Sequence, residues 1–130
     1  MKVEDIRNYP IKLPYIIPLK TSTNYFDVTT GLLVEILTNE GLKGYGYSEL
    51  FPRTGETITT AQAMMKEILV PGIKGKDPRE VRNILEWMDH KIVGNQRVKA
   101  GLETALQDLR GKANGVPVYE LLGGAVRKSV

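Results

Sequence analysis

The sequence predicts an α+β fold in which a three-stranded antiparallel meander is followed by a helical bundle. Up to Leu50 the apolar side chains recur with the period of two that is typical of strands. From Thr57 onward they recur with a period of about 3.6, which indicates amphipathic helices. Because the strand and helix patterns do not alternate, we expect an antiparallel sheet covered by a separate group of helices. The 130 residues are enough for one domain with a buried core.

A hairpin forms the second half of the predicted sheet. Residues 32–37 alternate between two faces, and the turn that follows them is Asn39-Glu40-Gly41. Tyr45 and Tyr47, spaced by glycine, continue the alternation after the turn. These residues therefore predict two antiparallel strands joined by a tight turn.

A third strand precedes the hairpin. Residues 3–13 carry apolar side chains at Ile6, Tyr9, Ile11 and Leu13. Residues 14–26 are rich in proline, serine and threonine, so we expect them to form a long loop. Long loops in compact domains are often functional.

Two helices are predicted between Thr57 and His90. The first begins at Thr57 as its N-cap and ends at Pro71-Gly72. Its apolar stripe consists of Ile58, Ala61, Met65 and Ile68. The second begins at Asp77-Pro78, an N-cap followed by proline at the first helical position, and places His90 near its end. Its apolar stripe consists of Val81, Ile84, Leu85 and Met88.

The third helix has the clearest pattern, and a short fourth helix follows it. The stripe of the third helix consists of Val98, Leu102, Ala105, Leu106, Leu109 and Ala113. Gly115 followed by Pro117 ends it. The short helix covers residues 117–122, with Gly123 or Gly124 as its left-handed cap. We therefore predict one domain over residues 1–124, and we expect residues 125–130 to begin a further strand.

Composition excludes several function classes. The chain has no cysteine and a single histidine, so it predicts neither a disulfide, nor a zinc site, nor a nucleophile–histidine pair. The 18 basic and 15 acidic residues are interspersed, which argues against a nucleic-acid partner. No stretch approaches the ~20 apolar residues of a membrane span, and the first residues lack the order of a signal peptide. We expect a cytoplasmic protein without a membrane partner.

The candidate site residues have plain structural interpretations. The stretch GLKGYG lacks the G-x-G-x-x-G spacing and GGAVRKS lacks the Walker spacing, so neither predicts a phosphate site. Glu103 and Asp108 are turned about 140° apart on one helix and cannot share a metal ion. Glu49 and Glu56 flank the loop LFPRTG; we expect solvated charges there, with a ligand contact as the alternative. The lysines of KGK, residues 74–76, are expected at the surface.

Residues 94–130 resemble a known family. The matching positions are Gly94-Asn95, Lys99-Ala100, Ala105-Leu106, Asp108-Leu109, Gly111-Lys112, Gly115, Pro117, Leu121-Leu122-Gly123-Gly124 and Arg127. They resemble the end of the N-terminal capping domain of enolase-superfamily enzymes of the mandelate racemase/muconate-lactonizing type. Residues 39–57 are similar to the second hairpin and following loop of that domain. Glu103, where many members have aspartate, is more similar to the muconate-lactonizing subgroup, whereas Gln107 departs from the tryptophan of many members.

The resemblance implies part of a two-domain enzyme. In this family a (β/α) barrel binds a divalent metal, usually Mg²⁺, and removes the proton alpha to the carboxylate of a small substrate. The implied reaction is a cycloisomerisation or an epimerisation, for example of a dipeptide, with acid-sugar dehydration or racemisation as alternatives. The metal ligands and bases of the family lie on the barrel, of which residues 125–130 would be only the start. We therefore assign no catalytic residue and no metal ligand, and we expect no turnover by this chain alone.

The resemblance also implies two substrate-specificity loops that close over the barrel, here residues 14–26 and 49–55. Lys20 and Arg53 are candidates to meet an anionic substrate group, with plain solvent exposure as the alternative. The candidates for excluding water are Ile16, Ile17, Tyr25 and Phe51. We expect a homo-oligomer. The alternative from another class is a stand-alone module for self-association or for binding a partner.

Overall fold

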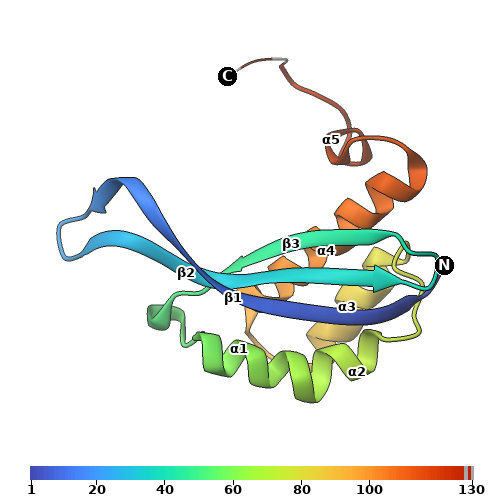
Figure 1. Cartoon of the computed structure of the whole chain (residues 1–130), viewed down its shortest axis with the longest axis horizontal. Helices are drawn as coiled ribbons and strands as arrows, with labels where there is room; N and C mark the ends of the chain where they lie inside the picture. The colour runs from blue at the N-terminus through green and yellow to red at the C-terminus, as the bar shows by residue number, and fades with distance from the viewer. Residues whose placement is uncertain (128, 130) are drawn as a thin grey trace.

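The predicted meander is confirmed. The computed structural model describes residues 1–127 and Ser129. Its sheet has the order β1-β2-β3, and both neighbouring pairs are antiparallel. The strands are β1 (Val3–Lys20), β2 (Tyr25–Thr38) and β3 (Lys43–Glu49). Figure 1 shows the three strands side by side, with β1 at one edge of the sheet.

The prediction of a long loop over residues 14–26 is wrong. β1 and β2 continue past the end of β3 as a two-stranded arm, residues 14–28, which projects from the body of the molecule (Figure 1). Pro14 pairs with Val28, and the register shifts before Leu19 pairs with Phe26. Prolines are tolerated here because β1 is an edge strand, where the N–H groups on one side have no sheet partner.

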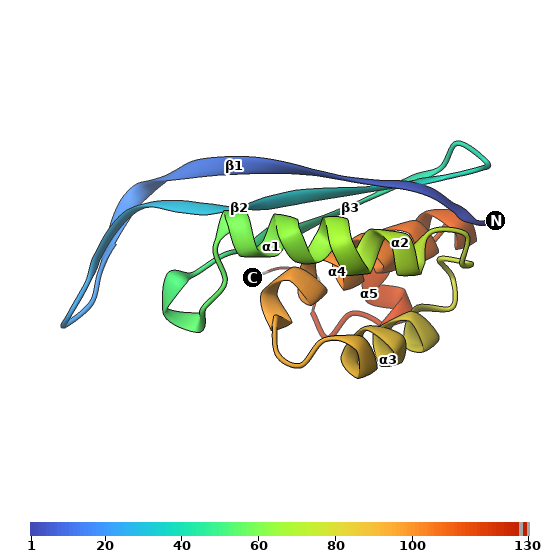
Figure 2. The same ribbon diagram turned by 90° about the horizontal axis from the view of Figure 1, so that it is seen from below.

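The helices cover one face of the sheet, as Figure 2 shows. They are η1 (Pro52–Thr54), α1 (Ile58–Met64), the wider π turn η2 (Met65–Leu69), α2 (Val70–Ile73), α3 (Val81–Lys91), α4 (Gln96–Asn114) and α5 (Val118–Leu121). The order of strands followed by helices confirms the α+β class.

The first helical run begins as predicted and ends later. Thr57 accepts a hydrogen bond from the N–H of Thr60, and the Thr60 hydroxyl in turn accepts one from the N–H of Thr57. The run continues through η2 to Ile73, so the predicted end at Pro71-Gly72 is wrong. Pro71 is tolerated because it lies in the first turn after the π turn, where the regular hydrogen-bond ladder is already interrupted.

The second helix starts later than predicted. The backbone N–H of Glu80 donates to the carbonyl of Asp77 at 3.1 Å, which closes a turn before α3 begins at Val81. The Asp77 carboxylate accepts from the N–H of Arg79 at 2.9 Å, so it serves this turn and does not cap α3. His90 lies in the last turn of α3, as predicted.

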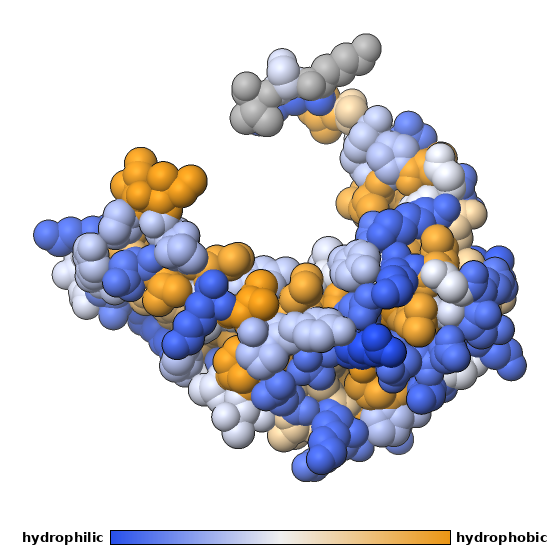
Figure 3. Space-filling view, viewed as in Figure 1, coloured by the Kyte–Doolittle hydropathy of each residue, from blue (hydrophilic) through white to orange (hydrophobic). Residues whose placement is uncertain are grey.

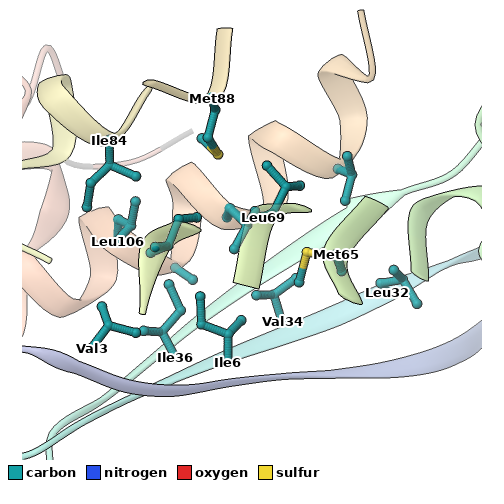
Figure 4. Close-up of a cluster of buried hydrophobic side chains, with 14 of the residues drawn as sticks. Val3, Ile6, Leu32, Val34, Ile36, Met65, Leu69, Ile84, Met88 and Leu106 are labelled. Carbon is teal, nitrogen blue, oxygen red and sulfur yellow. The ribbon is translucent and has the colours of Figure 1, made fainter. Parts of the chain in front are cut away.

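The core lies between the sheet and the helices. Its members labelled in Figure 4 are Val3, Ile6, Leu32, Val34, Ile36, Met65, Leu69, Ile84, Met88 and Leu106. Helix α4 packs directly against β3, because Gly44 and Gly46 let the two backbones approach: a Cβ atom at either position would collide with the α4 carbonyl of Ala105 or Gly101. The glycines of GLKGYG therefore serve close packing as well as the turn.

The C-terminal part follows the prediction with two exceptions. Gly115 adopts a left-handed conformation after α4, and the N–H of Gly124 donates to the carbonyl of Tyr119 at the end of α5. Ala113, predicted on the buried stripe, is exposed, because the helix instead buries Gly111 against residues 116–118. Residues 125–127 and 129 form no strand. Lys128 and Val130 of the predicted barrel strand lie outside the described residues.

Candidate functional site

A cleft of about 500 Å³ opens where the arm leaves the sheet. It lies between the arm and the segment that follows β3, which are the two stretches that the family resemblance implies as specificity loops. Its apolar lining includes Leu19, Phe26, Val28, Phe51 and Pro52. In the part of the chain that the structure describes, the charged side chains that line it are Glu49 and Arg97.

An aromatic pair crosses the cleft. The rings of Phe26, on β2, and Phe51, just after β3, have centroids 5.3 Å apart and are tilted by 51°. Tilted aromatic pairs at this separation are favourable. The Arg97 guanidinium lies 5.8 Å from the centre of the Phe51 ring, within cation–π range. The arm and the segment after β3 are therefore in direct contact at the base of the cleft.

Glu49 and Arg97 neutralise each other at the rim. Nη1 of Arg97 donates to the backbone carbonyl of Glu49 at 3.2 Å and lies 3.6 Å from its carboxylate. The Thr29 hydroxyl donates to the other carboxylate oxygen at 2.8 Å. Glu49 thus has two partners, Thr29 on β2 and Arg97 on α4.

Glu56 is buried, so the expectation of a solvated charge is wrong for this residue. It is 5% exposed, and its carboxylate accepts from the backbone N–H groups of Arg97 at 3.0 Å and of Val98 at 3.1 Å. These N–H groups open α4, where Asn95 makes no side-chain cap. A carboxylate at this end satisfies open donors and complements the helix dipole. No local sequence pattern marks this contact, since Glu56 and Arg97 are 41 positions apart.

The predicted site residues are only partly brought together. Phe51 lines the cleft. Ile16, Ile17 and Tyr25 are exposed on the strands of the arm, and Figure 3 shows apolar surface on the arm. Lys20 and Arg53 are exposed and make no ion pair with the described part of the chain. Sequence reasoning missed Phe26, Leu19 and Arg97.

A second polar cluster lies on the open face of the sheet. Glu35 is buried there, with Nζ of Lys43 at 2.9 Å and the hydroxyls of Tyr45 and Tyr9 at 3.1 and 3.2 Å. The hydrogen bond from Lys43 is the largest cause that lowers the pKa of the Glu35 carboxyl below its ordinary value. The donors satisfy the carboxylate, so the cluster ties the three strands together.

Lys99 is a further buried charge between α3 and α4. It is 5% exposed and donates to Asp89 at 2.8 Å and to the carbonyl of Ile92 at 2.6 Å. The Lys99 ammonium group therefore satisfies a backbone carbonyl at the C-terminal end of α3. Lys76, the second lysine of KGK, lies 4.7 Å from the centre of the Trp87 ring, and its neighbour Lys74 is exposed.

Among the residues that the structure describes, no three His, Asp or Glu side chains lie together as a metal ion would require. The described helices include none that is long and apolar enough to cross a membrane.

Two enzymes about three times longer than this chain are similar to it in sequence. N-succinyl-L-Arg/Lys racemase of Bacillus cereus is 33% identical over 125 residues, which are 95% of this chain and 34% of the racemase. Muconate cycloisomerase 1 of Rhodococcus opacus is 30% identical over 133 residues, with 100% of this chain and 36% of the enzyme covered. The chain thus spans about a third of the length of these relatives.

Solved structures show the same similarity. The crystal structure of N-succinyl Arg/Lys racemase from Bacillus cereus superposes with a TM-score of 0.91 at 32% identity, over 98% of this chain and 35% of the racemase. Muconate lactonizing enzyme from Pseudomonas fluorescens superposes with a TM-score of 0.89 at 29% identity, over 97% and 35%. The model of the mandelate racemase/muconate lactonizing enzyme N-terminal domain matches residues 6–123. The chain therefore belongs to this N-terminal domain family of the enolase superfamily, as its C-terminal motifs suggested.

Proposed function

We propose that this chain is the substrate-specificity domain, or cap, of a divalent-metal-dependent enzyme that removes a proton alpha to a carboxylate. The observation that carries the proposal is the family match over residues 6–123. The relatives that share the fold include muconate cycloisomerase and L-Ala-D/L-Glu epimerase. We therefore propose a cycloisomerisation or an epimerisation of a small carboxylate substrate as the parent reaction.

The cleft is the part of this chain that would contact the substrate. Phe51 lines it, and the strands of the arm carry the exposed side chains of Ile16, Ile17 and Tyr25. Closing such side chains over a substrate would exclude water, which strengthens the electrostatic interactions of the reacting atoms. Lys20 and Arg53 are exposed and available for an anionic group.

The chemistry itself would belong to a barrel. A bound Mg²⁺ would supply Lewis-acid stabilisation of the charge that develops on the substrate carboxylate. The described residues contain no cluster that would hold this metal, so we assign no reaction step to it on this chain. The role left to the chain is to bind, orient and enclose the substrate.

The parent reaction has alternatives. The relatives also include a racemase of N-succinylated amino acids and cis-3-hydroxy-L-proline dehydratase, at 33% and 39% identity. A racemase and a dehydratase would both begin with the same proton abstraction. They differ in whether solvent hydrogen returns to the same carbon or water is lost, so product analysis separates them.

A cytoplasmic location remains a prediction from the sequence.

A chimera tests the proposal. This chain would replace the N-terminal domain of the Bacillus subtilis L-Ala-D/L-Glu epimerase, which is 29% identical to it. We expect the chimera to exchange the alpha proton of a dipeptide with D₂O when Mg²⁺ is present, and this chain alone to give no exchange. A folded chimera without exchange, or exchange by this chain alone, would contradict the proposal. The unmodified epimerase is the positive control.

Self-association is a second candidate function, and exposed apolar side chains favour it. Ile16, Leu122 and Val126 are 100%, 71% and 101% exposed. Isolated exposed residues are normal, whereas clustered ones mark interfaces. Sedimentation equilibrium distinguishes the two cases: a mass that increases with protein concentration supports self-association, and a constant mass of one chain contradicts it.

A further inference from the structure

One wall of the cleft is fixed by α4. The segment after β3, residues 49–56, is held at its end by Glu56, which accepts from the first N–H groups of α4. It is held at its start by Arg97, whose Nη1 donates to the carbonyl of Glu49. Both anchors belong to one helical turn. The position of Phe51, which lies between them, is therefore set before a ligand arrives.

The charges at the cleft cancel. Glu49 and Arg97 are 3.6 Å apart, and they are the charged side chains among the described residues that line it. The other lining residues are apolar or uncharged. A cleft of about 500 Å³ is of the size that encloses small organic ligands, and such sites are mostly apolar.

We propose that this cleft binds an uncharged aromatic or bulky apolar group at the far end of a carboxylate substrate, and that it disfavours a second carboxylate there. The inference rests on the proposed function and names the substrate class of the same site. An aromatic group would lie against Phe26 and Phe51, where burial of apolar surface is favourable. A second carboxylate would lose hydration and lie near Glu49, and Arg97 is already neutralised.

A matched pair of probes tests this substrate class. N-benzoylglycine and N-succinylglycine share the carboxylate of glycine and differ at the far end, where one carries a phenyl ring and the other a carboxylate. Each would be titrated into this chain labelled with ¹⁵N, with chemical shifts followed at Thr30, Phe51 and the side chain of Arg97. We expect N-benzoylglycine to shift these signals with a Kd about tenfold lower than that of N-succinylglycine.

Substitutions assign the effect to the cleft. Phe51→Ala is expected to abolish the preference for N-benzoylglycine. Glu49→Gln is expected to tighten N-succinylglycine, because it removes the negative charge at the cleft and leaves the positive charge of Arg97 without its ion-pair partner. Glu49 is at the surface, so this variant remains informative even if Phe51→Ala weakens the fold. Tyr119→Ala, an exposed aromatic on α5, is the control and is expected to change neither probe.

The outcomes separate this inference from the proposed function. Equal or tighter binding of N-succinylglycine, or no shift at the cleft with N-benzoylglycine, would overturn the substrate class. If N-benzoylglycine binds at the cleft as expected but the folded chimera exchanges no proton, the substrate class stands and the proposed function fails.

Discussion

Glu56 shows how one buried side chain fixes the geometry of the cleft. Its carboxylate is the acceptor for two N–H groups of α4 that have no other cap. No local pattern marks it, because a glutamate that follows a turn is typically exposed. The interaction depends on the tertiary position of α4.

Glu56→Ala is expected to lower the free energy of unfolding by about 1 to 2 kcal/mol, because it leaves the first turn of α4 uncapped. Urea denaturation followed by circular dichroism measures this loss. Glu56→Gln is the matched control: its amide oxygen still accepts one hydrogen bond, so we expect a smaller loss. An alanine variant as stable as the original chain would contradict this role.

Asp77 makes stability depend on pH. Hydrogen bonds from the Arg79 side chain, at 2.6 Å from Nη2, lower the pKa of the Asp77 carboxyl from 3.8 to about 2. Because this pKa is lower in the folded state, the charged carboxylate stabilises the fold above about pH 4, and the gain is lost as the pH falls through about 2.

Asp77→Asn is therefore expected to cost no more than about 1 kcal/mol at neutral pH, since Arg79 is half exposed and solvent screens the pair. The difference from the original chain should shrink between about pH 4 and 2 in urea denaturation. Arg79→Gln should reproduce this pH dependence. A difference that persists unchanged at pH 2 would argue against the ion pair.

At the scale of elements, the sequence predicted what local periodicity encodes. The meander and α4 were predicted because alternation and the i, i+3, i+4 stripe are written directly into the residues. The arm was missed, because its prolines suggest a loop and only the open edge of β1 permits them. In the cleft, Phe51 was predicted from its segment, whereas Arg97 lies on a helix that folding brings to the site.

The two walls of the cleft are expected to differ in mobility. Residues 49–56 are anchored to α4. The arm, residues 14–28, has no third strand to support it, because the pairing of β2 with β3 begins only at Gly31. Hydrogen exchange measured by mass spectrometry should therefore be faster over residues 15–26 than over residues 50–56. Glu56→Ala should speed exchange in the second segment and leave the arm unchanged. Equal rates in the original chain would contradict a fixed wall.

At the scale of the molecule, the stability of the body is expected not to depend on the arm. No core residue of the described chain lies between positions 15 and 27. The hydrophobic core joins the sheet to α1–α4. Figure 3 shows the surface hollowed between the arm and the C-terminal helices. The arm is thus presented by a fold that does not depend on it.

Replacing residues 15–27 by Asn-Gly would join Pro14 to Val28, which are paired in the sheet. We expect the shortened chain to fold and to lose no more than about 1 kcal/mol, mainly from the lost contact of Phe26 with Phe51. Thermal unfolding measures this, with the original chain as reference. Loss of the cooperative transition would show that the arm supports the core.

The arm also bears on how the protein avoids aggregation. Two strands without a third expose backbone groups that would pair with any other strand edge. On β1 the edge of the arm carries Pro14 and Pro18, which interrupt the row of donors. Pro14→Thr combined with Pro18→Thr is expected to associate at rising concentration, as light scattering would detect, and a monodisperse variant would contradict this. The prolines that made this strand look like a loop in the sequence thus prevent a second copy of the chain from pairing with its edge.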